Sequence, residues 1–208
     1  MWELTELAMK INLLKEKGVS GLQERLNRLT SRDFSLYRST RYEIQIGGML
    51  LNRDYQIEFL NEGATKSPDL VATCADGECE LECKAKGPNE DNLELVQSIY
   101  GSTQIARKQF SKRRVGLILV NIDQPNFDGF QLERGRLEKE IFRAMRNSSS
   151  ISGIFLTSKI ATDDEGDFIY RHRTIGYANP DARHPIPGWL ARNLVTPLPD
   201  TDAATCAE

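Results

Sequence analysis

DLVATCADGECELECK, residues 69–84, is the stretch of this sequence that decides the fold. Asp76-Gly77 lies near its middle, between two runs rich in apolar residues. An Asp-Gly pair in that setting is a strong signal for the two-residue turn of a β-hairpin, because both central positions require a positive φ. We therefore predict a strand on each side of this turn, in a register that places Asp69 opposite Lys84.

The two faces of the predicted hairpin differ in chemistry. Side chains alternate between the faces of a sheet, and residues paired across two strands share a face. The polar face carries Asp69, Val71, Thr73, Glu80, Glu82 and Lys84. The apolar face carries Leu70, Ala72, Cys74, Cys79, Leu81 and Cys83. The pattern thus predicts carboxylates and an ammonium on one side of the hairpin and a hydrophobic core on the other.

The carboxylates of Asp69 and Glu82 need a reason to share one face. Two carboxylates about 5 Å apart repel each other by about 3 kcal/mol at an effective dielectric constant of about 20. A divalent cation removes this cost, and hard cations such as Mg²⁺ prefer carboxylate oxygens, whereas Lys84 relieves it only in part. The alternative is a solvated strand face with a surface Lys–Glu pair, which contributes little to stability.

The composition is that of a soluble globular protein, with 39% hydrophobic and 27% charged residues. A chain of 208 residues is long enough for one substantial hydrophobic core. No apolar stretch reaches the length that spans a bilayer. The acidic start, Met1 to Glu6, lacks the pattern of a signal peptide. We therefore expect a cytoplasmic protein with no membrane partner.

Cysteine, histidine and net charge narrow the chemistry further. The four cysteines do not form a disulfide framework in a chain of this length, and no paired Cys-x-x-C motif indicates zinc. The two histidines, His172 and His184, are distant from each other in sequence. The net charge of −3 argues against a protein that coats nucleic acid non-specifically. It leaves room for an enzyme that engages DNA or RNA through a local basic surface.

Apolar residues at helical spacing predict a helical hairpin over residues 1–30, which we treat as an N-terminal domain. We expect this hairpin to pack on the main domain, which covers residues 31–178. The alternatives for the hairpin are a dedicated DNA-binding module and a dimerisation element.

The next helix is predicted over residues 34–52, with Ser31 or Asp33 as its N-cap and Glu43 in its middle. Gly47-Gly48 lowers the helix propensity of this segment. We expect that the two glycines allow the helix to approach a neighbouring sheet closely, which would offset that cost.

The remaining elements follow from periodicity and turn signals. We predict strands over residues 55–60, 115–120, 154–157 and 168–171, and helices over residues 92–112 and 132–146. The apolar strand at 115–120 should be buried and parallel to its neighbour. The acidic segment 162–167 lacks the ligand register of a calcium loop and is interpreted as a hairpin turn. Residues 179–208 are expected to form an extended tail.

With these elements in the order helix, three strands, helix, strand, the chain resembles the PD-(D/E)XK nuclease superfamily. The matching residues are Pro68-Asp69 at the start of the second strand and Glu82-Cys83-Lys84 on the third. Glu43 is similar to the extra acidic residue that many members carry on the preceding helix. The resemblance implies an α/β, restriction-endonuclease-like fold, in which helices flank a mixed central sheet. The Gln-x-x-x-Tyr pattern of the RecB-like branch is not found.

The resemblance also implies a set of roles. Asp69 and Glu82 would ligate Mg²⁺ or Mn²⁺ together with the backbone carbonyl of Cys83, whose side chain is expected to point into the core. The metal would polarise a phosphoryl oxygen and lower the pKa of a bound water. Lys84 would orient that water or stabilise the charge on the phosphate. Glu43 would hold a second metal or position a water, the alternative being an exposed helix residue.

Three functions remain open at this point. The favoured one is a metal-dependent endonuclease that cleaves DNA. The second is a catalytically silent nucleic-acid-binding or regulatory protein on the same fold. The third is a protein-interaction module, in which the helical hairpin of residues 1–30 matters most and the acidic face is merely solvated. Many members of the superfamily of this size act as dimers, so the resemblance also implies a homodimer.

Basic residues gather at the C-terminal end of the helix predicted at 92–112: Arg107, Lys108, Lys112, Arg113 and Arg114. Cations at the C-terminal end of a helix complement its dipole, and that structural reason is sufficient for the cluster. Contact with phosphates is the sharper hypothesis. Gln104 and Lys108, four residues apart, are either ordinary surface residues of this helix or face the site.

Overall fold

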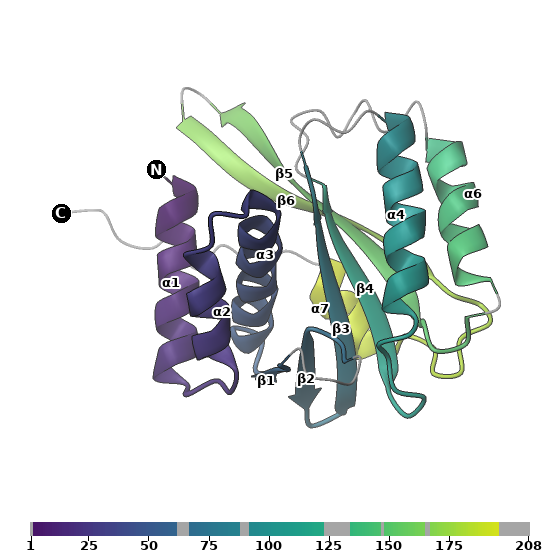
Figure 1. Ribbon diagram of the computed structural model, residues 1–208, viewed down its shortest axis with the longest axis horizontal. Coiled ribbons are helices and arrows are strands. Elements are labelled where there is room, and N and C mark those ends of the chain that lie inside the picture. Colours follow the sequence, from purple (N-terminus) through teal and green to yellow (C-terminus); the bar gives the residue numbers. More distant parts are fainter. Residues whose placement is uncertain are drawn as a thin grey trace.

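Six strands in the described part of the chain form one mixed sheet at the centre of the protein (Figure 1). The computed structural model describes residues 2–61, 67–87, 92–122, 134–146, 148–164 and 167–195. The strands are β1 (Gln56–Phe59), β2 (Leu70–Cys74), β3 (Gly77–Lys86), β4 (Val115–Ile122), β5 (Gly153–Asp164) and β6 (Asp167–Ala178), and they lie side by side in that order. β3, β4 and β5 are parallel, whereas β1–β2, β2–β3 and β5–β6 pair antiparallel.

Helices cover both faces of the sheet (Figure 1). One face packs against α1 (Trp2–Glu16), α2 (Leu22–Leu29), α3 (Phe34–Leu51) and α7 (Gly188–Val195). The other face packs against α4 (Asn92–Ala106) and α6 (Arg134–Met145). The predicted α/β architecture is therefore confirmed as a mixed sheet between two helical layers, with a helical hairpin at the N-terminus.

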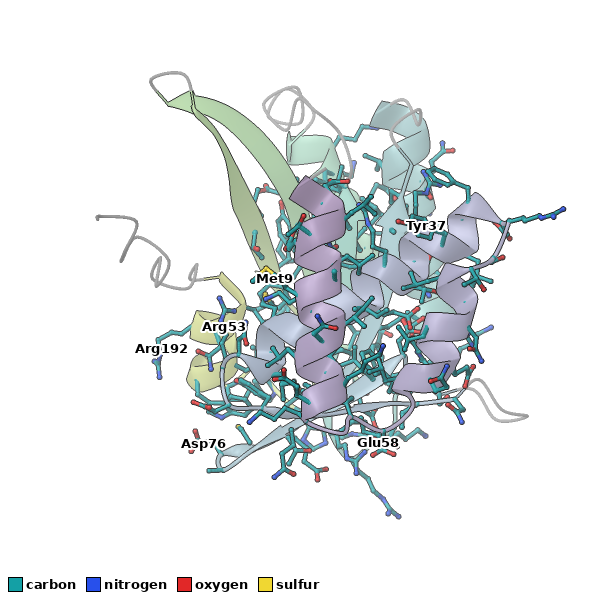
Figure 2. The ribbon with its side chains drawn as sticks, turned by 90° about the vertical axis from the view of Figure 1, so that its left-hand side faces the viewer. Met9, Tyr37, Arg53, Glu58, Asp76 and Arg192 are labelled. Carbon is teal, nitrogen blue, oxygen red and sulfur yellow. The ribbon has the colours of Figure 1, made fainter. Side chains whose placement is uncertain are left out.

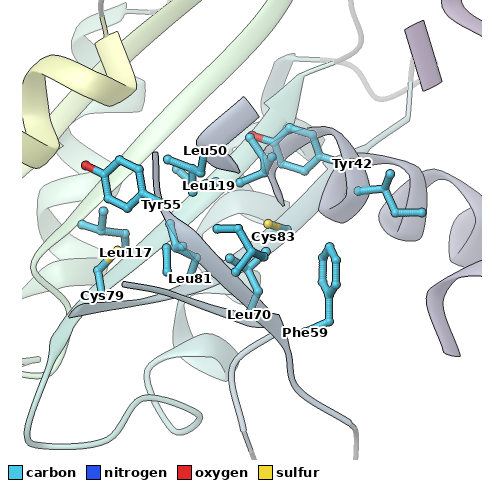
Figure 3. Close-up of a cluster of buried hydrophobic side chains, with 14 of the residues drawn as sticks. Tyr42, Leu50, Tyr55, Phe59, Leu70, Cys79, Leu81, Cys83, Leu117 and Leu119 are labelled. Atoms are coloured by element: carbon cyan, nitrogen blue, oxygen red, sulfur yellow. The ribbon is translucent and has the colours of Figure 1, made fainter. Parts of the chain in front are cut away.

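Burial of apolar side chains on both faces drives this arrangement, at about 25 cal/mol per Å² removed from water. Figure 3 shows the core on the α3 side, where the apolar face of the β2–β3 hairpin meets α3 and β1. Leu70, Leu81 and Cys83 lie there as predicted, each at most 1% exposed. No helix of the described residues has both the length and the apolar character needed to cross a membrane.

α3 confirms the prediction for residues 34–52. Asp33 is its N-cap, and the Asp33 carboxylate accepts hydrogen bonds from the amides of Ser35 and Leu36. The two glycines have different neighbours: a Cβ on Gly47 would lie 2.7 Å from Cζ of Phe59 on β1, whereas a Cβ on Gly48 would meet Lys10 of α1. The expected close approach to the sheet thus holds for Gly47 only.

The predicted register of the β2–β3 hairpin is wrong by two residues. Leu70 pairs with Leu81, so the turn residues are Ala75 and Asp76, and Gly77 begins β3. Of the Asp-Gly pair, only the glycine has a positive φ, 149°, so the turn is not the type with two positive central residues. Because side chains repeat every two residues along a strand, a shift of two leaves every residue on its predicted face. Asp76 lies at the edge of the protein (Figure 2).

The later elements depart from prediction mainly in their ends. α4 ends at Ala106, six residues before the predicted end of that helix, and the segment that follows leads into β4. β4 is parallel to β3 as predicted. β5 and β6 are twelve residues each and pair up to Asp164 and Asp167, which confirms a hairpin whose tip, residues 165–166, lies outside the described residues.

The segment from residue 179, expected to be extended, contains helix α7. Leu190 and Leu194 bury against the α3-side core. The Asn193 amide donates a hydrogen bond of 2.8 Å to the hydroxyl of Tyr55. The helix begins directly after Pro187, whose carbonyl accepts hydrogen bonds from the amides of Leu190 and Ala191. Residues 196–208, with Cys206, lie outside the described residues.

Candidate active site

Asp69, Glu82 and Lys84 lie together on the polar face of the sheet, as the sequence predicts. Asp69 directly precedes β2, and its amide donates a hydrogen bond of 3.1 Å to the carbonyl of Leu81. Its Oδ2 accepts a hydrogen bond of 2.7 Å from the amide of Cys83. Leu81 pairs with Leu70 and also accepts from the amide of Asp69, so Asp69 lies next to Leu81 of β3 and not opposite Lys84, the predicted partner. The carboxylate of Asp69 is held against the middle of β3.

Cys83 separates the two charged residues of β3 and faces away from them. Its side chain is 1% exposed and belongs to the α3-side core, so no sulfur faces the carboxylates. Burial, followed by the charge of Asp69, raises the pKa of this thiol well above its ordinary value. The N–H and C=O of one strand residue point to the same side of the strand. Since the amide of Cys83 points to Asp69, its carbonyl faces the same side.

Glu82 is a buried carboxylate with incomplete hydrogen bonding. Its side chain is fully buried, Oε1 accepts a hydrogen bond from Nζ of Lys84, and Oε2 has no partner. Burial and the neighbouring charge of Asp69 raise the pKa of Glu82 to about 7, and the side chains of Lys84 and Gln109 oppose this shift. A buried charged group that is short of partners is costly, and it marks a place where the protein lacks positive charge.

Lys84 is the cation that contacts the carboxylate of Glu82. Burial by itself would lower the pKa of Lys84, but the charges of Asp69 and Glu82 outweigh it and raise that pKa above its ordinary value. The side chain is 28% exposed, so it contacts Glu82 and still reaches solvent. Lys84 is therefore protonated at neutral pH, which suits a donor to an anionic oxygen and does not suit a general base.

Glu43 is not an exposed helix residue, because it is only 4% exposed. Its Oε2 accepts a hydrogen bond of 2.9 Å from Nε of Arg25. Burial and the charge of Asp69 raise the pKa of Glu43 to about 7, while Arg25 acts in the opposite direction. The structure thus brings Glu43 near Asp69, as predicted, and gives it an ion-pair partner that we did not predict.

Arg25, on α2, is the main residue that the sequence analysis missed. It is fully buried and bonded to Glu43 and to two backbone carbonyls. The signal lies in the spacing of α2, because Arg25 follows Leu22 by three residues and precedes Leu29 by four. It therefore lies on the apolar stripe of the helix, where a charged residue requires a buried partner.

Most polar and basic residues at the end of α4 and in the segment after it do not contact the candidate site. Gln104 donates to the carbonyl of Ala144 on α6 and does not face the site, whereas Gln109 donates to the carbonyl of Ser67, near Asp69. Arg114 pairs with Glu78 and Glu80 of β3. Lys108, Lys112 and Arg113 are exposed.

The described residues do not form a complete metal cage from side chains. Among them, no group of three histidine, cysteine, aspartate or glutamate side chains is arranged to hold a metal ion. The expected ligand set, however, contains the carboxylates of Asp69 and Glu82 and a backbone carbonyl. Glu43, the third carboxylate nearby, is engaged by Arg25 instead.

Comparisons with known proteins add little to this site. No protein-family model and no curated protein matches the sequence. Among solved structures, the chain is similar to SfsA of Pyrococcus furiosus in complex with Ca²⁺, with 17% sequence identity and a TM-score of 0.32. The similarity covers 65% of this chain and 62% of the SfsA chain, so the match spans less than two thirds of that protein. A similarity this distant says nothing about the chemistry of this chain.

Proposed function

We propose that this protein is a metal-dependent nuclease that hydrolyses phosphodiester bonds of DNA, with the site at Asp69, Glu82 and Lys84. The observation that carries the proposal is the fully buried carboxylate of Glu82, whose Oε2 accepts no hydrogen bond and whose pKa is raised by burial and by the charge of Asp69. A site that is structural only would be expected to satisfy both oxygens of a buried carboxylate.

The oxygen atoms that could serve as metal ligands fit a hard divalent cation such as Mg²⁺ or Mn²⁺. The carboxylates of Asp69 and Glu82 and the carbonyl of Cys83 all offer oxygen, and the sulfur of Cys83 lies in the core. Such an ion supplies Lewis-acid polarisation of a phosphoryl oxygen and activation of water. It also supplies the positive charge that this pair of carboxylates lacks.

Lys84 acts through its ammonium group. Its partial exposure lets Nζ donate to a non-bridging phosphate oxygen or to the attacking water. Donors already in place where negative charge develops stabilise a transition state without further reorganisation. We assign Glu43 the role of placing a water or a second metal, through the carboxylate oxygen that Arg25 does not engage.

The test is cleavage of supercoiled plasmid and of single-stranded DNA in the presence of Mg²⁺, Mn²⁺ or EDTA. We expect metal-dependent cleavage by the wild type, and its loss in Asp69→Ala and Lys84→Ala. Glu78→Ala is the matched control, because Glu78 is exposed, lies on the same strand and pairs with Arg114. Lys84→Ala should retain Mn²⁺ binding, measured by calorimetry, while Asp69→Ala loses it. Failure of the folded wild type to cleave with any metal would contradict the proposal.

A second candidate is a nucleic-acid-binding protein without catalysis. It is favoured by the pairing of both glutamates of the candidate site with a cation, Glu43 with Arg25 and Glu82 with Lys84. Binding of labelled DNA in EDTA, combined with no cleavage in Mn²⁺, would support this candidate over the nuclease.

A further inference from the structure

Arg25 connects the N-terminal helical hairpin to the candidate site. The residue lies on α2, and its side chain is fully buried, so it touches neither solvent nor substrate. Its guanidinium lies over the ring of Phe59, 5.4 Å from the ring centroid. A charge buried this deeply is tolerated only when hydrogen bonds and an opposite charge compensate for lost hydration.

The hydrogen bonds of Arg25 converge on the elements that carry the site. Nε donates to Oε2 of Glu43 at 2.9 Å. Nη2 donates to the carbonyl of Leu60 at 2.7 Å and to the carbonyl of Asp69 at 2.9 Å. One side chain therefore joins α3, the end of β1 and the residue that precedes β2.

We infer that Arg25 is a positioning residue that fixes the carboxylate of Glu43 and the backbone of Asp69, which makes α2 an integral part of the site. That Arg25 affects catalysis rests on the proposed function. That Arg25 holds Glu43 and Asp69 in place rests on the geometry alone. Arg25 acts through Glu43 and Asp69 and contacts no reacting atom.

The guanidinium is suited to this task in a way that an ammonium is not. Its donors leave a planar, rigid group in fixed directions, whereas a lysine ammonium is a compact point charge on a flexible stem. Three acceptors on three separate segments are bonded at once here. A lysine at this position would keep the charge and lose the simultaneous contacts.

The start of α2 is fixed against β1 by contacts that do not involve Arg25. Gly21 has a φ of 74°, and a Cβ there would lie 2.1 Å from the carbonyl oxygen of Phe59. The amide of Phe59 donates to the carbonyl of Ser20 at 3.0 Å. The helix that carries Arg25 is thus held at the sheet edge, which argues against a separable interaction module.

The test uses the full-length protein with Arg25→Met and Arg25→Lys. Arg41→Met is the matched control, since Arg41 forms a 3.0 Å ion pair with Glu3 that also joins the hairpin to α3. Because Arg25→Met leaves Glu43 buried beside a missing charge, a double variant, Arg25→Met with Glu43→Met, removes both charges and guards against failure to fold.

The decisive readout is the amide resonance of Cys83 in a two-dimensional ¹H–¹⁵N spectrum. This amide donates to Oδ2 of Asp69, so its chemical shift reports the placement of that carboxylate without any need for activity. We expect the resonance to move in every folded Arg25 variant and to keep its wild-type position in Arg41→Met. A wild-type position in the folded Arg25 variants would overturn the inference.

Kinetics separate positioning from plain stability. If the wild type cleaves DNA, we expect kcat to fall by about 100-fold in Arg25→Lys, with little change in KM for DNA. A loss of this size is typical when a catalytic group is displaced by about 1 Å. Wild-type kcat in folded Arg25→Lys would count against positioning. A wild type that neither cleaves DNA nor binds Mn²⁺ refutes the nuclease proposal, and the Cys83 resonance then still decides the inference about Arg25.

Discussion

Glu80 and Glu82 lie two residues apart on the same face of β3, and the protein treats them in opposite ways. Glu80, 3% exposed, accepts a 2.7 Å hydrogen bond from the amide of Ser111 at Oε2, and its Oε1 lies 3.6 Å from Arg114. Glu82, fully buried, shares Oε1 with Lys84 and leaves Oε2 without a partner. Glu80 thus anchors the segment that precedes β4. In Glu82, by contrast, one carboxylate oxygen accepts no hydrogen bond.

Burial alone does not separate a structural acidic residue from a functional one. Both glutamates are buried, so the difference lies in how fully each is compensated. In Glu80, one oxygen accepts a hydrogen bond from the Ser111 amide and the other lies at ion-pair distance from Arg114. The Glu82 region places a second carboxylate, Asp69, beside the first, which raises the energy of the ion-free state. A stored electrostatic cost of this kind is common where a site is built for a ligand.

The largest expected difference is in catalysis. Glu82→Gln should lose metal-dependent DNA cleavage by about 1,000-fold or more, since the loss of a metal ligand removes several kcal/mol of transition-state stabilisation. Glu80→Gln should cleave at a rate within about threefold of the wild type, because an amide oxygen can still accept from Ser111. Initial rates of plasmid nicking give both values. Equal losses of cleavage in the two variants would mean that Glu80 and Glu82 do not differ in function.

For the free energy of unfolding, substitution of Glu80 should be more damaging than substitution of Glu82. Glu80→Ala leaves the amide of Ser111 without its acceptor, so the free energy of unfolding should fall by about 2–3 kcal/mol. Glu82→Gln removes a charge that is poorly accommodated, so the protein should become more stable at pH 7.5. Urea unfolding of both variants at that pH is the measurement, and a Glu82→Gln less stable than Glu80→Ala would contradict the comparison.

The pH dependence of stability follows from the same cause. The pKa of Glu82 is raised from its ordinary value of 4.5 to about 7, so the folded state holds this proton more tightly than the unfolded state. The resulting stabilisation is fully present below pH 4.5 and is lost as the pH rises to about 7. Glu82 alone should therefore lower the free energy of unfolding of the metal-free wild type by about 3 kcal/mol across this window. Glu82→Gln should show a smaller fall, with Glu43 supplying the remainder, and an identical pH profile in the two proteins would be inconsistent with this origin.

A bound cation should reverse this destabilisation. Mn²⁺ at ten times its Kd should raise the free energy of unfolding by about 1.4 kcal/mol at pH 7.5, because it binds the folded state alone. At pH 5 the gain should shrink, since the carboxyl groups compete for protons. Thermal unfolding with and without EDTA measures the effect, and Asp69→Ala is the variant in which it should vanish. A gain of equal size in Asp69→Ala would place the ion elsewhere.

The sequence predicts the face of each residue in the hairpin better than it predicts the pairing. Asp76-Gly77 suggests a turn, yet the turn in the structure is Ala75-Asp76. Alternation has a period of two, so an error of two residues leaves Asp69, Glu82 and Lys84 together on one face. The candidate site is therefore recoverable from local pattern, whereas the partner opposite Asp69 depends on turn geometry.

Arg25 and α7 show what local pattern leaves out. The role of Arg25 depends on Glu43 and Asp69, which are 18 and 44 residues away, and no periodicity within α2 identifies them. For α7, Pro and Asp residues nearby suggest an extended chain, but Leu190 and Leu194 recur at helical spacing after Pro187. Tertiary packing of those two side chains outweighs the turn-rich composition around them.

The smallest expected effect concerns the basic residues that follow α4, near Glu80. Arg114 pairs with the exposed Glu78 and, at 3.6 Å, with the buried Glu80, so Arg114→Met should cost on the order of 1 kcal/mol of stability, less than Glu80→Ala. Lys112 is exposed, and if its side chain contacts a phosphate, Lys112→Met should reduce the slope of log K against log salt by about 0.9. Arg114→Met should leave that slope unchanged, because its guanidinium is engaged by carboxylates. DNA binding measured in EDTA over a range of salt concentrations compares the two variants. A reduced slope in Arg114→Met alone would mean that the Glu80 end of β3, and not only the Glu82 end, belongs to the nucleic-acid surface.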